Sequence, residues 1–382
     1  MEKQLNVPKL RFPEFKGEWE KKKLEKFSIS ISSGKSKMKD LEGKFPLFGS
    51  TGVIGRTDNY DYSGKSILIA RVGANAGKLY IVDGNFSVTD NTLILNLNCS
   101  IDIDFVFNYL VKTNLNKLVF GSGQPLITAG QLKNLDVSFP SLPEQSRIAS
   151  FFSAIDEKLK LETQRLTALK QYKKGVMQKL FSQELRFKDE NGKEFPDWEV
   201  KKLGEIIDYK NGGSYENLVC DNGKYFLITL NSLDVNGKLK PDHKRVNATD
   251  NSLKKGDLVM VLSDVAHGFF LGLTDIIPSN NYVLNQRMGG LKPKEDIDFN
   301  SYYLKTYINY NQKYFKLKGQ GSSQKNLGKE DVLFFKIECP KINEQTKIAN
   351  FLSSIDDKID QAEKRLQLIQ MYKKGLLQQM FV

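Results

Sequence analysis

The stretch EQSRIASFFSAIDEKLKLETQRLTALKQYKKGVMQKLF, residues 144–181, returns as EQTKIANFLSSIDDKIDQAEKRLQLIQMYKKGLLQQMF at residues 344–381. The second copy starts 200 residues after the first and aligns with it without a gap. Self-similarity at a fixed offset indicates an internal structural repeat. We therefore predict that the chain uses one structural unit twice.

Each copy has the apolar spacing of a long helix. In the first copy, apolar residues recur at alternating steps of four and three residues, at Ile148, Phe152, Ile155, Leu159, Leu166, Leu169, Val176 and Leu180. This heptad seam, which Glu162 and Lys173 interrupt in the first copy and Lys373 in the second, is typical of helices that pack on each other. Burial of each helix against a globular domain is the alternative. We favour mutual packing, because neither helix can bury its seam alone.

The repeat extends upstream of the helices with smaller offsets. Trp19-Glu20 matches Trp198-Glu199, and the segment 102–110 matches 296–304. The repeated unit is therefore a globular part followed by a helix. The globular parts have diverged much more than the helices, which indicates a shared docking element and two different targets.

The direction of the helices follows from the chain order. The second globular part starts where the first helix ends and stops where the second helix begins. Because the two ends of a compact domain commonly lie near each other, the helices should run antiparallel, with a pseudo-two-fold axis. About 38 residues of helix correspond to roughly 57 Å.

The fold class expected is α+β, with two mixed α/β domains separated by two long helices that form an antiparallel coiled coil. The predicted boundaries are 1–142 for the first domain, 143–184 for the central helix, 185–341 for the second domain and 342–382 for the C-terminal helix. Between Gly and Asn turns we expect strands at 66–71, 78–82, 91–95, 136–139, 225–230, 257–262, 269–273 and 332–337, and helices at 105–111 and 302–308. Residues 182–197 are the predicted linker.

The charge balance suits a polyanionic partner. The formal net charge is +12. Residues 1–142 carry 19 basic and 14 acidic side chains, and residues 185–341 carry 24 and 21. The positive excess therefore belongs to both globular parts rather than to a tail, as expected where folded surfaces meet nucleic acid.

Loops in both globular parts combine Gly, Ser, Asn, Arg and Lys. Arg, Asn and Gln can read base edges through paired hydrogen bonds, while Lys and Ser meet phosphates. Ordinary polar turns are the alternative for any single loop. The candidate DNA-binding residues are Lys35, Lys37, Ser50, Thr51, Arg56, Arg71, Asn75, Lys78, Lys210, Asn211, Ser214, Ser263, Asn285, Arg287, Gln324 and Lys325.

Signs of catalysis are missing from the sequence. The run Gly73–Leu79 is one residue short of a P-loop and lacks its Ser or Thr. No Pro follows Asn or Asp, so the signature of amino-methylating enzymes is absent. The two histidines, His243 and His267, stand far apart, and no Cys-x-x-Cys occurs. We expect a non-catalytic, cytoplasmic protein without cofactor, metal or membrane span.

The repeated Glu-Gln-x2-Ile-Ala-x-Phe…Ile-Asp-x-Lys…Tyr-Lys-Lys-Gly…Phe helix, with Phe48–Gly52 and Ile69–Gly77 upstream, resembles the DNA-specificity subunit of Type I restriction–modification enzymes. The resemblance implies two target-recognition domains that each read half of a bipartite double-stranded DNA site, with a spacer set by the helices. It also implies two docked modification (methyltransferase) subunits and restriction (motor-nuclease) subunits. The competing hypotheses are an enzyme with its own methyltransferase or nuclease centre, and a two-headed DNA-binding protein or coiled-coil adaptor outside restriction–modification.

Overall fold

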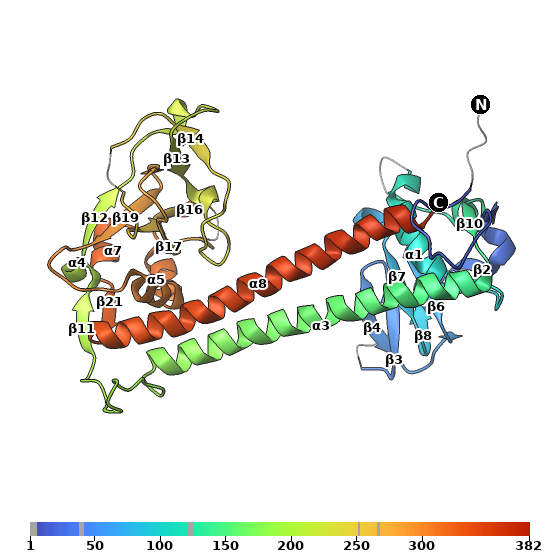
Figure 1. Cartoon of the computed structure of the whole chain (residues 1–382), viewed down its shortest axis with the longest axis horizontal. Helices are drawn as coiled ribbons and strands as arrows, with labels where there is room; N and C mark the ends of the chain where they lie inside the picture. The colour runs from blue at the N-terminus through green and yellow to red at the C-terminus, as the bar shows by residue number, and fades with distance from the viewer. Residues whose placement is uncertain (1–5, 38–41, 121–124, 251–252, 266–267) are drawn as a thin grey trace. The chain divides into compact units, whose positions relative to one another are not determined.

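The computed structural model describes residues 6–37, 42–120, 125–250, 253–265 and 268–382. The chain divides into two compact units, Met1–Leu166 with Ala362–Val382 (unit 1) and Thr167–Gln361 (unit 2). Helices α3 (Leu142–Phe181) and α8 (Ile342–Met380) each contribute residues to both units (Figure 1). Each unit therefore combines one globular domain with parts of both long helices.

Two four-stranded sheets form most of the domain of unit 1. The larger sheet has the order β2 (Ser28–Ser33), β9 (Thr92–Leu97), β6 (Ser66–Ala70), β7 (Leu79–Val82), and all its pairs are antiparallel. The smaller sheet has the order β4 (Gly52–Thr57), β3 (Phe45–Gly49), β8 (Asn85–Val88), β5 (Tyr62–Ser63). Within it, β3 and β8 are parallel, so both strands end at the same edge.

Unit 2 repeats this topology. Its antiparallel sheet has the order β12 (Ile207–Asn211), β19 (Met288–Pro293), β15 (Leu258–Val261), β17 (Thr274–Ile276). The second sheet has the order β14 (Lys244–Val246), β13 (Tyr225–Ile228), β18 (Tyr282–Leu284), again with the last two strands parallel. The two domains thus share a framework although their sequences have diverged.

Each domain brings its own beginning and end together. Strand β1 (Glu20–Lys23) pairs with β10 (Asp136–Phe139), and β11 (Glu199–Lys202) pairs with β21 (Lys336–Cys339). Two residues separate each closing strand from the long helix that follows it. This closure confirms the premise from which the helix direction was predicted.

Short elements complete the domains and cover the sheets. The longest are α1 (Ile103–Thr113), α5 (Ser301–Tyr310) and α6 (Gln312–Lys318). The others are α2 (Ala129–Lys133), α4 (Leu203–Ile206), α7 (Lys329–Leu333), β16 (Ser263–Val265), β20 (Gln324–Asn326), and the 3-10 turns η1 (Leu24–Phe27), η2 (Gly73–Asn75), η3 (Leu115–Leu118), η4 (Glu216–Leu218) and η5 (Leu230–Ser232).

The long helices run antiparallel within each unit. In unit 1, Lys373 lies 2.5 Å from Asp156, and Arg365 lies 3.3 Å from Glu162. The later residue of α8 thus pairs with the earlier residue of α3, as it does only in antiparallel helices. In unit 2, Lys173 lies 2.6 Å from Asp356. Polar residues that interrupt the heptad seams therefore form ion pairs across the helix pair, as charged groups at a helix interface must.

The ends of the helices are also buried in the domain cores. Leu376, Met380 and Phe381 pack in one cluster with Trp19 and Phe105 of the first domain. In unit 2 the ring of Phe181 packs edge-on against Tyr307, with centroids 5.1 Å apart. Burial of one aromatic side chain contributes roughly 1.5–3 kcal/mol, so each domain is stabilised by the helix that ends on it.

Two predicted strands are wrong in unit 2. Residues 269–273 form turns, and the strand begins only at Thr274, because Gly268 and Gly272 have φ of +64° and +78°. A Cβ at Gly272 would stand 2.4 Å from the Cβ of Phe315, so this close approach requires glycine. The segment 332–337 is split between α7 and β21. The strand predicted at 136–139 has its predicted ends as β10, and the other predicted strands and short helices are present with shifted ends.

Neither a metal-binding group of His, Cys, Asp and Glu nor a helix long and apolar enough to cross a membrane occurs within the described residues. The three cysteines are free thiols, and burial raises the pKa of Cys339 to about 12. His267 lies outside the described residues.

Candidate nucleic-acid interface

In unit 1 the predicted residues gather at the edge where the parallel strands β3 and β8 end. A depression of about 410 Å³ lies there, lined by Lys35, Ser36, Lys37, Gly49, Ser50, Ile54, Thr89, Asp90 and Asn91. Lys35 and Lys37 follow the end of β2, while Ser50 lies in the turn between β3 and β4. Three predicted residues from two separate loops thus line one surface.

Arg71 borders this depression. Its backbone N–H donates to the carbonyl of Asn91 at 2.9 Å, and its Nη1 lies 3.5 Å from the carbonyl of Asp90. The Nε atom of Arg71 and the hydroxyls of Thr89 and Thr92 are buried without a hydrogen-bond partner. Buried polar groups are normally satisfied, so these unpaired atoms are unusual for a folded interior.

Three more predicted residues are connected to Ser50, Thr51 directly along the chain and Lys78 and Asn75 through the ring of Tyr80. The Lys78 ammonium lies 5.4 Å from the centre of the Tyr80 ring, and the Tyr80 hydroxyl donates to the Ser50 carbonyl at 3.3 Å. Thr51 is exposed in the same turn, and Asn75 accepts from the Lys78 N–H through its backbone carbonyl at 2.9 Å. The ring of Tyr80 therefore connects the loop of Lys78 to the turn of Ser50.

Arg56 differs from the other candidates. Its guanidinium donates to the backbone carbonyls of Gly43, at 2.5 Å, and Lys44. These bonds hold the segment before β3 against β4. The geometry thus favours a structural role for Arg56 over a DNA contact.

Unit 2 has its depression at the corresponding strand ends. About 300 Å³ in volume, it is lined by Glu216, Thr229, Leu230, Asn231, Lys244, Asn285, Gln286 and Arg287. Its Glu216 carboxylate accepts hydrogen bonds from Lys244 at 2.9 Å and from the buried Asn285 at 2.7 Å. These donors, with Arg287 nearby, lower the pKa of Glu216. The buried Asn285 thus holds the Glu216 carboxylate in place in the depression, while the side chain of Arg287 remains exposed.

A second group of predicted residues adjoins Arg287. Ser263, Gln324 and Lys325 lie on the paired strands β16 and β20, where Gln324 donates to the Ser263 hydroxyl at 2.5 Å. The backbone N–H of Leu262, directly before Ser263, donates to the Arg287 carbonyl at 3.0 Å. The structure therefore brings together two strands whose hydrogen-bonded residues, Ser263 and Gln324, are 61 residues apart in sequence.

Three candidates lie at or just after the end of β12, at the same edge. Lys210 forms an ion pair with Asp250 at 2.8 Å, and Asn211 accepts from the Tyr209 hydroxyl at 2.6 Å. Ser214 is exposed and precedes Tyr215, whose N–H donates to Asn285 at 3.3 Å. Of the three, Ser214 stands nearest to the depression along the chain.

The structure adds residues that the sequence interpretation missed. Lys244, Glu216 and Gln286 line the depression of unit 2, and Asp90 and Asn91 line that of unit 1. Lys244 lies on β14, outside the Gly-rich polar loops from which the candidate residues were selected, so the sequence pattern did not indicate it. Gln286 stands between two candidates, and its exposure could have been suspected from the polar run Asn285–Arg287.

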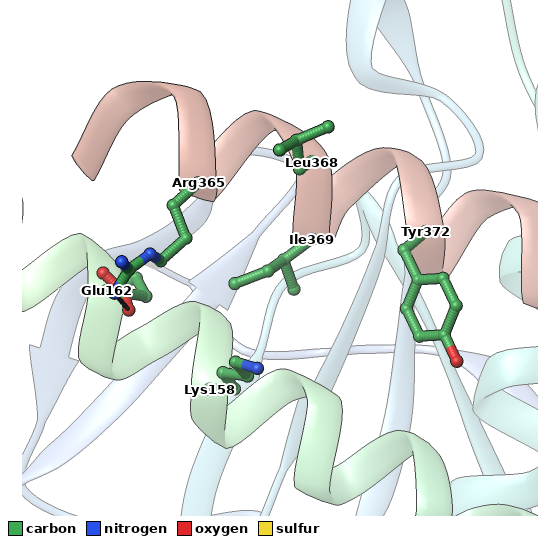
Figure 2. Close-up of a pocket in the computed structure, with 6 residues that line it drawn as sticks. All are labelled: Lys158, Glu162, Arg365, Leu368, Ile369 and Tyr372. Carbon is green, nitrogen blue, oxygen red and sulfur yellow. Dashed lines mark hydrogen bonds and ion pairs between the residues drawn. The ribbon is translucent and has the colours of Figure 1, made fainter. Parts of the chain in front are cut away.

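A separate surface lies on the helix pair of unit 1. Figure 2 shows the Arg365 side chain reaching from α8 to Glu162 on α3, beside Lys158, Leu368, Ile369 and Tyr372, which together line a groove of about 370 Å³. Leu368, Met371 and Tyr372 are 64%, 69% and 59% exposed, and Leu161 on α3 is 55% exposed. Large apolar side chains exposed next to one another are typical of protein-binding surfaces.

Comparison with known proteins adds independent information. The family model of the Type I restriction modification DNA specificity domain matches residues 13–171 and 196–371. The Type I restriction enzyme MjaVIII specificity subunit of Methanocaldococcus jannaschii is 27% identical over 336 residues, 81% of this chain and 77% of that protein. The EcoprrI specificity subunit of Escherichia coli is 31% identical over 112 residues, 29% of this chain and 28% of that protein.

A solved structure has the same fold. The S subunit of the Type I restriction–modification system from M. genitalium matches with a TM-score of 0.69 and 21% identity, over 98% of this chain and 99% of that one. At this identity the likeness concerns the fold. The two matched segments of the family model each include one globular domain and most of one long helix.

Proposed function

Because the chain belongs to the family of Type I restriction–modification DNA specificity subunits, whose role in the complex is non-catalytic, we propose that its two domains each read one half of a bipartite double-stranded DNA site. One observation carries the proposal. The ends of the parallel strand pair in both domains carry a depression lined by cationic and amide side chains together with one carboxylate, Asp90 in unit 1 and Glu216 in unit 2. Two surfaces in matching places of a repeated fold suit two half-sites.

The side chains around the two depressions divide by chemistry. Lys35, Lys37, Lys78, Lys244 and Lys325 are suited to phosphates, which position a protein on DNA. Arg71, Arg287 and Gln324 have the paired donors and acceptors that distinguish base edges. Asn75, Ser50, Thr51, Ser214 and Ser263 complete the surface as hydrogen-bonding groups. The reading surface of unit 1 thus lies within residues 1–142, and that of unit 2 within residues 185–341.

The long helices are the proposed dock for partner subunits. Leu161, Leu368, Met371 and Tyr372 expose apolar surface on the helix pair, beside the charges of Lys158 and Arg365. We propose that residues 143–184 and 342–382 bind two methyltransferase subunits and that restriction subunits join this assembly. A cytoplasmic location, where the DNA substrate and these partners meet, belongs to the same proposal.

Methylome sequencing tests the function. The chain is expressed with its methyltransferase partner in a host that lacks this system, and modified adenines are mapped. A methylated bipartite motif that appears only when the chain is present is the expected result. Methylation that is independent of the chain would overturn the proposal. Methyl transfer or cleavage by the purified chain alone, with S-adenosylmethionine and magnesium, would place a catalytic centre in it instead.

A further inference from the structure

We propose that two exposed residues at the tip of one turn in each unit, Asp90-Asn91 and Gln286-Arg287, determine which bases that unit reads. The inference rests on the proposed function, since it names specificity-determining side chains on the proposed DNA surfaces. The two tips share no sequence motif. Their correspondence is a property of the fold.

Each tip belongs to a closed four-residue turn. In unit 1 the Thr92 N–H donates to the Thr89 carbonyl at 3.2 Å, and in unit 2 the Met288 N–H donates to the Asn285 carbonyl at 2.9 Å. The flanking residues of both turns are buried, whereas both central residues are exposed. Each turn therefore offers two side chains, and only two, to a molecule outside.

Matching backbone hydrogen bonds hold both turns in place. In unit 1, Thr89 donates to Phe48, Arg71 to Asn91 and Gly34 to Thr92, at 2.9–3.0 Å. In unit 2, Asn285 donates to Ile228, Leu262 to Arg287 and Gly212 to Met288, over the same range. Three neighbouring segments thus fix each turn. Side chains on a rigid turn lose little freedom on binding, which favours precise contacts.

These bonds join main-chain atoms, so the frame does not depend on the side chains at the tip. The tip residues can therefore change without loss of the fold. A DNA-recognition domain needs this freedom if its target sequence is to change. Both tips line the depressions of the proposed DNA surface, next to Lys35 and Lys37 in unit 1 and Lys244 in unit 2. Lysines that hold phosphates would bring base edges to the tips.

The tip chemistry indicates the bases. Arg287 can donate two hydrogen bonds to O6 and N7 of guanine, and Gln286 or Asn91 can pair with N6 and N7 of adenine. Asp90 only accepts when ionised, so it suits the amino group of cytosine or adenine. Unit 2 is therefore expected to require a purine step with guanine, and unit 1 a base that presents an amino group.

Exchange of the tips tests the inference. One variant carries Asp90→Gln with Asn91→Arg, and the reciprocal variant carries Gln286→Asp with Arg287→Asn. Each is expressed with the methyltransferase partner, and the modified motif is mapped. The expected result is a change of roughly 10- to 100-fold in base preference at one or two adjacent positions of one half-site, with the other half-site unchanged. A motif that stays identical in both variants would overturn the inference.

Further measurements separate this result from loss of folding or of the proposed function. Glu190→Gln with Asn191→Arg is the matched control, because these residues form the tip of an exposed turn in the linker, and it should leave the motif unchanged. Arg287→Lys keeps the charge and should relax one position. If a tip variant abolishes modification, its affinity for DNA is measured instead. A loss of affinity confined to cognate DNA supports the inference, and an equal loss of affinity for unrelated DNA contradicts it. A wild-type chain that confers no bipartite motif would instead contradict the proposed function.

Discussion

Lys373 of α8 lies 2.5 Å from Asp156 of α3, and Lys173 of α3 lies 2.6 Å from Asp356 of α8. In sequence, these are the same two positions of the repeated helix with their partners exchanged. Only antiparallel helices in one register can make both pairs. The Asp of each repeated Ile-Asp motif and the first Lys of each Tyr-Lys-Lys-Gly motif thus determine the register of the helix pair.

Reversal of one charge should reveal this register. Lys373→Glu places two acidic groups together and should lower the free energy of unfolding by about 1 kcal/mol, the upper range for partly exposed pairs. The double variant with Asp156→Lys should recover most of that loss. Chemical denaturation of all four forms measures the coupling in a double-mutant cycle. Purely additive effects would show that this pair does not stabilise the helices.

Glu144 and Glu344 should be essential for stability. Each buried carboxylate accepts from an arginine upstream, Arg11 at 2.7 Å and Arg186 at 2.8 Å, and from the indole N–H of Trp19 or Trp198. Substitution of either Glu by Ala would remove the buried carboxylate partner of a largely buried guanidinium and cost about 3 kcal/mol. Thermal unfolding measures the loss.

The control for this prediction is Glu157→Ala, since Glu157 is exposed on α3 and contacts only Lys160, at 3.7 Å, among the ion pairs of the described residues. It should change stability by less than about 0.5 kcal/mol. Equal effects of Glu144→Ala and Glu157→Ala would mean that the buried pair contributes little.

Removal of one cation from the proposed surface should weaken DNA binding without regard to sequence. Lys35→Ala should reduce the steepness of the plot of log binding constant against log salt concentration by about one unit. Lys26→Ala is the matched control, because Lys26 is exposed before β2, whereas Lys35 follows the end of that strand. Fluorescence anisotropy at several salt concentrations measures both. Identical slopes in the two variants would remove Lys35 from the interface.

Arg71 should behave differently from Lys35. Its Nη1 lies 3.5 Å from the Asp90 carbonyl beside the depression, where the guanidinium can meet a base edge. Arg71→Ala is expected to relax one position of one half-site by roughly 1–3 kcal/mol while affinity for unrelated DNA changes little. Competition binding with single-base variants of the mapped motif provides the measurement. A uniform loss over all sequences would assign Arg71 to phosphate contact.

The helices are proposed to set the spacer between the half-sites. Four residues inserted in both helices, near Thr163 and Glu363, add about 6 Å per helix. The mapped spacer should then lengthen by one or two base pairs, at about 3.4 Å each, with both half-sites unchanged. Some loss of stability is expected, since four residues leave a heptad stutter. An active variant with its original spacer would limit the helices to docking.

Sequence alone determined the elements whose signal is local or repeated. Heptad spacing predicted α3 and α8, because a helix repeats every 3.6 residues and its seam is visible in one stretch of chain. The offset of 200 residues revealed the repeat, and chain order then gave the antiparallel direction. Strands such as β6 and β9 were predicted from apolar runs between turns.

Tertiary structure decided what depends on contacts between distant segments. Leu10-Arg11-Phe12 and Leu185-Arg186-Phe187 are copies of one motif, but their role appears only where each Arg meets a Glu about 130–160 residues away. The turns at 269–273 follow from the packing of Gly272 against Phe315, which no local pattern records. The match between Asp90-Asn91 and Gln286-Arg287 likewise arises from main-chain hydrogen bonds. Such bonds are made by nearly every residue type, so they leave no trace in the sequence.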